Sequence, residues 1–228
     1  MVALARYQSE PTHDPESNEA VLLGQIERVE AVLTQLGTVH ERNFANREKE
    51  ILQGLASSDS FEQAQKLLGE LLGFDAGKVE SDGSPDPWWI ADNFCIVFED
   101  HAGALKESAI DVTKARQVAS HPAWMRTNVE ASAKAEILSV LVTPVSKVKK
   151  GAVSHLDKVC LWSLPDFREW AKNALVVIRE LRKTFVEPGD LVWRASAVEA
   201  FEQNKLDACG LFEQLRVKSA ASLLEAVN

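Results

Sequence analysis

The apolar residues between positions 22 and 36 recur at the spacing of a helix. Successive members of this set are four, three, four and three residues apart, which aligns them along one side of a helix; they are Leu22, Ile26, Val29, Leu33 and Leu36. Ser17 is suited to cap the start of this helix, and Gly37 is suited to end it. Because the stripe is short, we expect the helix to pack against the body of the protein rather than to form a free coiled coil. A second, mostly polar helix is predicted over residues 39–55.

From residue 59 the pattern changes between helical and extended segments. The predicted elements are, in order, a helix over 60–72, strands over 74–79, 86–90 and 94–98, a helix from 111 or 113 to 125, and a strand over 137–143. Ala-Asp-Asn at 91–93 joins the second and third strands with residues typical of a hairpin. Ser60 followed by Gln63 predicts a capping box at the start of the first helix. This order of elements predicts an α/β fold with a mixed sheet.

The last third of the chain is predicted to be mainly helical. We expect a basic loop at 146–151, an extended piece at 159–162, a long helix over 165–183 and a helical tail from 190 onward. The chain then divides into four parts. These are a flexible leader (1–18), an N-terminal helical segment (19–58), a core (59–145) and a mainly helical C-terminal part packed on that core (146–228).

Composition narrows the class of protein. The 228 residues carry a formal net charge of −9, so the average electrostatic field repels a polyanion. Binding to nucleic acid then requires a local basic patch, or a partner that supplies the affinity. The three cysteines are widely spaced and indicate neither a disulfide framework nor a zinc site, which favours a reducing cytoplasm. We expect neither membrane insertion nor secretion, because no apolar run is long enough to span a bilayer and the N-terminus lacks a signal-peptide pattern.

Two acidic residues stand where the predicted hairpin can bring them together. Asp86 begins one strand, Glu99 ends the next, and a tight turn joins the two strands. Antiparallel pairing can therefore place both carboxylates at one edge of the sheet. Two carboxylates a few ångströms apart repel each other, and a divalent cation between them is the usual reason to keep both ionised. Mg²⁺ suits such a site because it keeps several waters and leaves positions open for phosphate oxygens.

Pro85-Asp86 followed by Glu99-x-His101, within this order of elements, resembles the PD-(D/E)XK nuclease-like superfamily. The signature of that superfamily is Pro-Asp, a spacer, Asp or Glu, any residue, and Lys. The resemblance covers residues 60–143 and implies a restriction-endonuclease-like αβββαβ core with added N- and C-terminal helices. By implication, Asp86 and Glu99 would hold Mg²⁺ or Mn²⁺, and residue 101 would orient or deprotonate the attacking water.

Two further positions resemble the RecB-like branch of this superfamily. Gln117 and His121 match its Gln-x-x-x-Tyr helix motif with His in place of Tyr, so Gln117 would orient the substrate or the site. Glu70 resembles the acid that the first core helix often contributes, here as an accessory metal ligand.

The main departure from the family pattern is His101, which replaces the motif lysine. Histidine can accept a proton near neutral pH and can ligate a metal, but it lacks the long cationic stem of lysine. Lys114, on the following helix, can supply a cation from another direction. The best candidates for phosphate contacts lie in the basic segment after the last core strand; they are Lys147, Lys149 and Lys150.

The resemblance implies a metal-dependent nuclease domain that hydrolyses phosphodiester bonds of DNA or RNA. The acidic chain would work in a larger assembly, such as a helicase or ATPase complex or an antiviral defence complex. The alternative is a catalytically inert nuclease-like module that binds protein partners through its helical ends.

Each candidate residue also has an ordinary structural interpretation. Pro-Asp-Pro at 85–87 is typical of a turn, and the polar triplet at 99–101 is typical of a strand end meeting water. Glu70 can be a solvent-facing helix residue, and Gln117 and His121 can be surface neighbours one helical turn apart. The six tryptophans favour core packing over stacking on bases.

Overall fold

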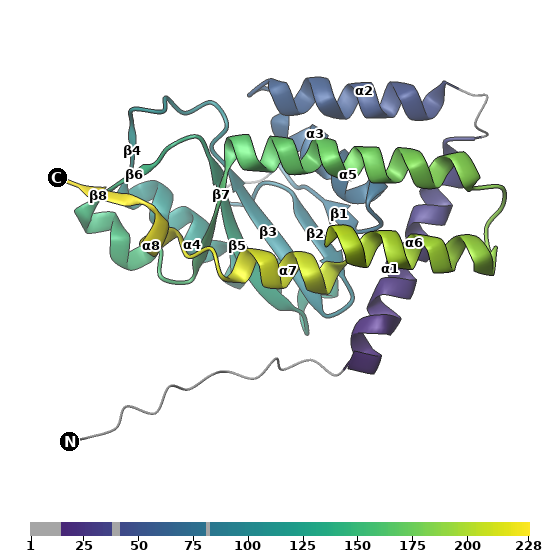
Figure 1. The fold of residues 1–228 in the computed structure, drawn as a ribbon. Helices are drawn as coiled ribbons and strands as arrows, with labels where there is room; N and C mark the ends of the chain where they lie inside the picture. The colour runs from purple at the N-terminus through teal and green to yellow at the C-terminus, as the bar shows by residue number, and fades with distance from the viewer. Residues whose placement is uncertain (1–14, 38–41, 81–82) are drawn as a thin grey trace, which may run out of the picture.

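The computed structural model describes residues 15–37, 42–80 and 83–228. Its helices surround a mixed sheet (Figure 1). The α-helices are α1 (Pro15–Gln35), α2 (Asn43–Ala56), α3 (Phe61–Leu71), α4 (Val112–Asn128), α5 (Leu164–Thr184), α6 (Leu191–Asn204), α7 (Ala208–Arg216) and α8 (Ala220–Leu223). The strands are β1 (Asp75–Gly77), β2 (Trp88–Ala91), β3 (Phe94–Asp100), β4 (Ala109–Ile110), β5 (Glu136–Thr143), β6 (Lys147–Lys149), β7 (Val159–Ser163) and β8 (Glu225–Val227). Two 3₁₀ helices, η1 (Glu130–Ser132) and η2 (Lys150–His155), lie in the connections.

The main sheet has the strand order β1-β2-β3-β5-β7. The pairs β1–β2 and β2–β3 are antiparallel, whereas β3–β5 and β5–β7 are parallel. The prediction of an α/β fold with a mixed sheet is therefore confirmed. Strand β3 lies in the middle of the sheet, where antiparallel pairing gives way to parallel pairing. No described helix is long and apolar enough to span a lipid bilayer.

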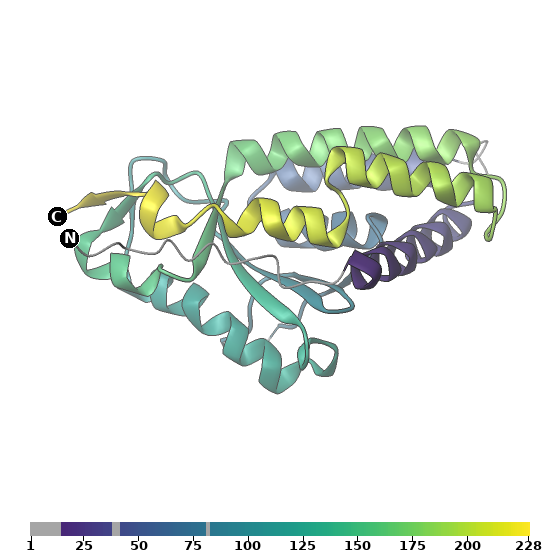
Figure 2. The same cartoon turned by 60° about the horizontal axis from the view of Figure 1, so that its bottom comes forward.

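Helices cover both faces of the main sheet (Figure 2). Alternate residues of β3 enter the main core, which also contains α3, α5 and α7; they are Phe94, Ile96 and Phe98. The residues between them, Cys95 and Val97, face the other way and pack with Met125 of α4. Side chains of a strand alternate between faces, so β3 contributes to both cores and stays apolar until Glu99.

Helix α1 packs against the body of the protein, as its apolar stripe predicts. All five residues of the stripe are buried; they are Leu22, Ile26, Val29, Leu33 and Leu36. The fully buried Gln25 donates to the carbonyls of Leu72, at 2.8 Å, and Leu206, at 3.0 Å. Its side-chain oxygen accepts from the N–H of Ala208 at 3.0 Å. Helix α1 thereby joins the end of α3 to the start of α7.

The ends of the N-terminal helices differ from the predicted ones. Residues 1–14 of the expected leader lie outside the described residues, and α1 begins at Pro15, inside the expected leader. The predicted start of the second helix at residue 39 also lies outside the described residues, and α2 begins at Asn43. The predicted capping box of α3 is wrong, because Ser60 makes no side-chain hydrogen bond at the helix start.

The C-terminal part contributes strands as well as helices. The basic segment at 146–151 was expected as a loop, and this is wrong: Lys147–Lys149 form β6, between β4 and β8 in a second, parallel sheet. The reason is pairing with β4 and β8 on either side, which buries Val148 between two more exposed lysines. Strand β7 joins the main sheet beside β5. The C-terminal part (146–228) therefore supplies a strand of the main sheet as well as helices that pack on it.

Trp89 fixes the position of α3 against the sheet. Its buried indole extends from β2 and donates from Nε1 to the carbonyl of Gln65 at 3.2 Å. A Cβ atom at Gly69, one turn further along α3, would lie 2.2 Å from Trp89 Nε1. The close approach of helix and indole therefore requires glycine at this position.

Gly69→Ala is expected to destabilise the protein by about 1–3 kcal/mol, because the added methyl group overlaps the Trp89 indole. Gly24→Ala on α1 is the matched control, since a Cβ atom there would meet its nearest neighbour, Arg28 Nη1, at 3.8 Å. We expect this control to be neutral or stabilising by up to about 1 kcal/mol. Urea denaturation measures both free energies of unfolding, and equal stabilities would contradict the role given to Gly69.

Candidate active site

The β2–β3 hairpin places Asp86 opposite Glu99. Trp88 pairs with Val97, and the N–H of Phe98 donates to the carbonyl of Pro87 at 3.1 Å, so the pairing continues past the start of β2. Extending this register by two residues sets Asp86 across from Glu99. Alternation of side chains puts both carboxylates on the α4 face of the sheet. The structure thus brings together the two acids that the sequence singled out.

Asp86 is half-buried between two buried prolines, Pro85 and Pro87. Its Oδ2 accepts a hydrogen bond from the backbone N–H of Asp100 at 2.5 Å. Burial and the charge of Glu99 raise the pKa of Asp86 to about 7, against the opposing effect of the Asp100 N–H. Asp86 therefore does more than form a turn, because its side chain links the two strands of the hairpin.

Glu99 is a buried carboxylate, 2% exposed, with a donor on each oxygen. Its Oε1 forms an ion pair with Lys114 Nζ, and its Oε2 lies 2.6 Å from Nε2 of His121. Burial alone would raise the pKa of Glu99, but the hydrogen bonds from His121 and Lys114 outweigh burial and lower it. Glu99 is thus held ionised inside the protein.

Helix α4 delivers both partners of Glu99. Its N-cap is Asp111, whose side chain accepts from the N–H of Lys114 at 2.9 Å and so fixes the first turn. Lys114 and His121 are seven residues apart, two turns of the same helix face. The interpretation of His121 as a surface residue is wrong, because its side chain is fully buried. Gln117, half-buried, lies between the two along the helix.

His101 follows β3 directly and faces the same region. Its backbone N–H donates to the carbonyl of Val142 at 2.8 Å, which keeps residue 101 aligned with β5. Burial and the charge of Lys114 lower the pKa of the imidazole, so neutral histidine is favoured near neutral pH. The Nδ1 atom of His101 is buried and has no hydrogen-bond partner among the described residues.

A second group of polar residues lies on the α3 face of the sheet, and the sequence did not point to it. Asp100 faces α3, where the amide of Gln65, in the orientation that satisfies its hydrogen bonds, donates to Oδ2 at 2.6 Å. Burial and the charges of Asp86, Glu62 and Glu99 raise the pKa of Asp100 well above its usual value. Glu62 is itself paired with Lys78 Nζ, at 2.5 Å. For this polar group, the sequence offers one sign: Glu62 and Gln65 are three residues apart on the helix predicted before the hairpin, which places them on one side of it.

The structure does not bring Glu70 to this group. Glu70 lies eight residues after Glu62 on α3, about 12 Å along the helix axis. It pairs with Lys66 at 3.0 Å and approaches Arg47 at 3.9 Å. Together with Arg28 and others it lines a cavity of 740 Å³ between α1, α3 and β1. Within the described part of the chain, the ion pairs of Glu70 are therefore with Lys66 and Arg47, and none of them joins it to Asp86 or Glu99.

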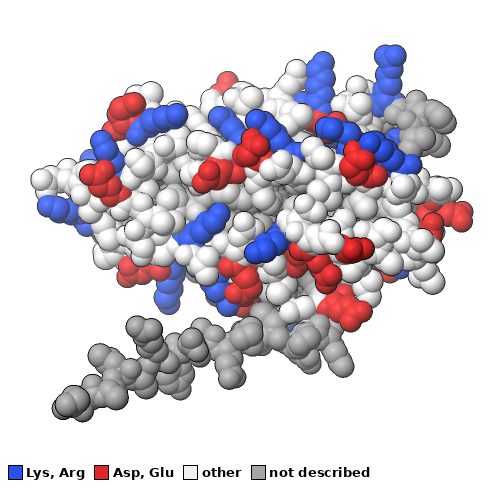
Figure 3. Space-filling model, viewed as in Figure 1, with Lys and Arg blue, Asp and Glu red and all other residues white. Residues whose placement is uncertain are grey.

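The lysines expected to contact phosphate lie in and beside β6. Lys149 and Lys150 are exposed, and Lys147 is half-buried. Lys150 Nζ donates to the side chain of Asn228 at 2.5 Å, next to β8. On the face shown in Figure 3, basic and acidic side chains are interspersed. A polyanion would therefore meet alternating charges on that face.

A metal ion at this site would have two carboxylates from the protein. No group of three or more His, Cys, Asp and Glu side chains forms a metal site in residues 15–37, 42–80 and 83–228. A hydrated Mg²⁺ or Mn²⁺ takes one or two carboxylates and keeps waters, so Asp86 and Glu99 would be its protein ligands, with Lys114 and His121 already bonded to the two oxygens of Glu99. The raised pKa of Asp86 reflects burial and repulsion by Glu99. A cation next to both carboxylates would relieve that repulsion.

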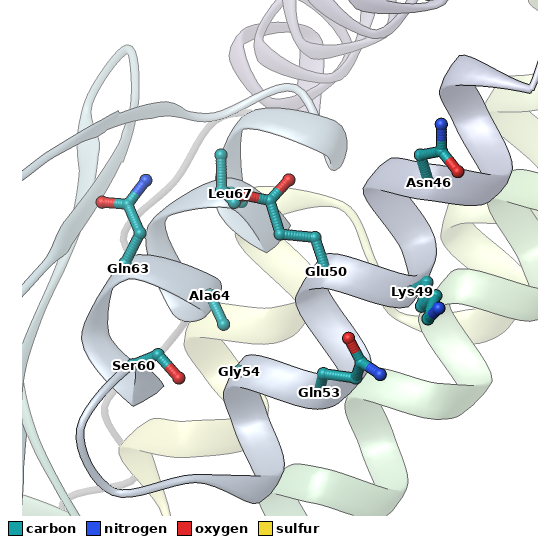
Figure 4. A pocket seen from close by; sticks show the side chains of 9 residues that line it. All are labelled: Asn46, Lys49, Glu50, Gln53, Gly54, Ser60, Gln63, Ala64 and Leu67. Carbon is teal, nitrogen blue, oxygen red and sulfur yellow. The ribbon is translucent and has the colours of Figure 1, made fainter.

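A polar groove lies between α2 and α3, beside the turn that leads to Glu62 (Figure 4). Its volume is 430 Å³, and its polar lining includes the amides of Asn46, Gln53 and Gln63. A Cβ atom at Gly54 would lie 2.5 Å from that of Ala64, so the glycine allows the two helices to approach. The groove opens on the opposite side of α3 from Gln65, whose side chain is fully buried.

The sequence matches no known family model, and no curated protein is significantly similar to it. The fold and the geometry of these side chains therefore carry the evidence for a function.

His121→Ala is expected to lower the free energy of unfolding by about 3 kcal/mol, because Glu99 would lose one of its two donors inside the protein. His155→Ala is the control: His155 is half-buried and its Nε2 lies 3.3 Å from Arg116 Nε on the surface. We expect that control to change stability by less than about 0.5 kcal/mol. Chemical denaturation compares the two, and similar small effects would show that Glu99 does not depend on His121.

Asp100→Asn is expected to stabilise the protein increasingly as pH rises. The pKa of Asp100 in the folded protein lies above its unfolded value, so wild-type stability falls as pH rises from about 4, the unfolded value, toward the folded pKa. Asparagine removes this ionisation, so the difference in Tm between variant and wild type should grow between pH 4 and pH 8. Asp157→Asn, at an exposed position, is the control. A difference that stays constant with pH would contradict the assignment.

Proposed function

We propose that this chain is a metal-dependent nuclease domain that hydrolyses phosphodiester bonds of DNA or RNA. The observation that supports it best is the placement of Asp86 opposite Glu99, with Lys114 paired to the same carboxylate. Two carboxylates and a cation at one end of a sheet suit the binding of a hydrated ion and a phosphate. The resemblance to the PD-(D/E)XK nuclease-like superfamily and its restriction-endonuclease-like core is part of this proposal.

In the proposed site, Asp86 and Glu99 would hold Mg²⁺ or Mn²⁺. The ion, when bound, supplies charge stabilisation for the phosphate and acidifies a bound water. His101 lies two residues after Glu99 with its pKa lowered, so its neutral imidazole can accept a proton from the attacking water. Gln117 lies between Lys114 and His121 on α4 and is positioned to orient the substrate.

The proposed reaction is the hydrolysis of a phosphodiester bond. The water oxygen forms a bond to phosphorus, and the bond from phosphorus to the leaving sugar oxygen breaks, with the electron pair staying on that oxygen. One water proton passes to His101, and the leaving oxygen takes a proton from solvent. His101 then returns its proton to solvent, so the site is restored after each turnover.

The acidic chain favours action within a larger assembly. A net charge of −9 repels nucleic acid on average, so a partner that carries basic surface would supply the affinity. The lysines beside β6, Lys147, Lys149 and Lys150, are the proposed local contacts to phosphate.

A catalytically inert nuclease-like module is the second candidate. It is favoured by the contacts of Glu99, since both of its oxygens already have protein donors. In that case Glu99, Lys114 and His121 form a buried polar network that holds α4 on the sheet.

Asp86→Asn and Glu99→Gln are expected to lower cleavage by about a hundredfold or more, because each removes a charge that holds the ion. The assay uses single-stranded and duplex DNA and RNA with Mg²⁺ or Mn²⁺, and calorimetry measures Mn²⁺ binding to the same variants. Asp86→Asn should also leave the fold intact or slightly more stable, since it relieves repulsion by Glu99. Glu187→Gln, exposed between α5 and α6, is the control and should cleave like wild type.

Two outcomes would contradict the nuclease proposal. Wild-type protein that neither cleaves any of these substrates nor binds Mn²⁺ would favour the inert module. Cleavage that survives both substitutions would show that the reaction takes place elsewhere in the protein.

A further inference from the structure

The cavity of 740 Å³ between α1, α3 and β1 shares no lining residue with the pair of acids in the candidate active site. Its lining combines charged side chains with an apolar wall, which is formed by Val32, Leu36 and Phe74. Phe74 is buried, and its ring stacks on Trp89 with the ring centroids 5.4 Å apart, so the main core holds this wall in place. The volume falls within the roughly 300–1,000 Å³ of pockets that hold small molecules.

Arg28 is anchored at one nitrogen and presents the rest of its guanidinium to this cavity. It is half-buried on α1, and its Nε donates to the carbonyl of Gly73 at 2.5 Å. A Cβ atom at Gly73 would lie 2.2 Å from the carbonyl oxygen of Gln25, so the turn after α3 packs directly on α1. The two Nη atoms of Arg28 make no hydrogen bond or ion pair with any residue that the structure describes. This edge of the guanidinium can therefore take both oxygens of a carboxylate.

Asp75 supplies an unpaired negative charge to the same cavity. Burial lowers the pKa of Arg28, and the charges of Asp75, Asp92 and Glu27 act in the opposite direction, so these acids are near the guanidinium. Glu27 is paired with Arg194 at 2.8 Å, and Asp92 lies in the β2–β3 turn. Asp75 lines the cavity, and within the described part of the chain its carboxylate has no hydrogen bond or ion pair.

The other charged groups of the lining have partners. Glu70 pairs with Lys66 at 3.0 Å and approaches Arg47 at 3.9 Å, and Arg47 also approaches Glu50 at 3.5 Å. The described lining thus presents one positive and one negative group that are near each other and unpaired. A simple anion would be repelled by the acid, and a simple cation by the arginine. A ligand that carries both charges close together would satisfy both groups.

We propose that this cavity binds a free α-amino acid with a large apolar side chain. Its carboxylate lies at the Nη edge of Arg28, its ammonium faces Asp75, and its side chain packs against the wall of Val32, Leu36 and Phe74. Both polar contacts are charge-assisted hydrogen bonds, which are the stronger kind. The inference does not depend on the proposed nuclease function, because it uses none of the same side chains.

L-Phenylalanine is the probe, together with two analogues that each lack one charge. N-acetyl-L-phenylalanine lacks the ammonium, and L-phenylalaninamide lacks the carboxylate. We expect calorimetry to show that L-phenylalanine binds at least about tenfold more tightly than either analogue, because each loses one charge-assisted bond. Glycine keeps both charges without a side chain and should also bind at least about tenfold more weakly, since it buries no apolar surface.

Two variants assign the charges to their residues. Asp75→Asn should weaken binding of L-phenylalanine by about tenfold and leave that of N-acetyl-L-phenylalanine unchanged or stronger, because this analogue has no ammonium to lose. Arg28→Gln should weaken binding of L-phenylalanine likewise and leave that of L-phenylalaninamide unchanged or stronger. Circular dichroism checks that Arg28→Gln stays folded without its bond to Gly73, and Asp75→Asn keeps that bond. The matched controls Asp157→Asn and Arg126→Gln, at exposed positions outside the cavity, should bind like wild type.

Three results would overturn the inference. The first is L-phenylalanine that does not bind at millimolar concentration. The second is equal affinity for N-acetyl-L-phenylalanine, which would identify a site for apolar anions instead of amino acids. The third is unchanged affinity in both Asp75→Asn and Arg28→Gln, which would place the ligand elsewhere. Each of these results would leave the nuclease proposal standing.

Discussion

The architecture around the candidate site depends on keeping one charge, Glu99, inside the protein. An ionised carboxylate with little exposure is costly unless donors replace the lost water. Helix α4 supplies these donors two turns apart, and this requirement fixes the position of the helix along the sheet. The first turn must lie where Asp111 can cap it, and the third must carry His121 into the interior. A shift of α4 by one residue would remove both contacts at once.

The geometry of Asp86 follows from the same strand. Glu99 and Asp100 point to opposite faces, so β3 presents one acid to α4 and the next to α3. Asp86 is connected to both, by position to Glu99 and by a hydrogen bond to the backbone of Asp100. Besides burial, the charges of Asp86 and Glu99 in turn raise the pKa of Asp100 on the α3 face. The two faces of the sheet form one electrostatic unit.

Sequence patterns predicted those features that depend on local periodicity. The apolar stripe of α1, the hairpin between β2 and β3 and the mixed sheet all have a regular repeat or a turn signal. Features that depend on pairing between distant segments were missed. A three-residue strand such as Lys147–Lys149 carries one buried valine, too few for a periodic signal, and becomes a strand because β4 and β8 flank it.

The candidate site shows the same division. Asp86 and Glu99 could be associated because a short hairpin separates them along the chain. His121 reaches Glu99, and Gln65 and Glu62 act on Asp100, only after α4 and α3 dock on opposite faces of the sheet. A helix rises about 1.5 Å per residue, so Glu70, eight positions after Glu62, lies about 12 Å further along α3 and contacts other elements.

The buried amide of Gln25 has a consequence for how the chain reaches its native state. It joins α1 to Leu206 and Ala208, residues that leave the ribosome long after the helix itself. The connection from β5 to β7, the last strand of the main sheet, also passes through β6 of the second sheet. Such distant contacts slow folding, because loop-closure entropy is lost before the contacts form. The predicted core (59–145) and the C-terminal part (146–228) therefore cannot fold one after the other. We expect them to fold together, once residues near 208 have been synthesised.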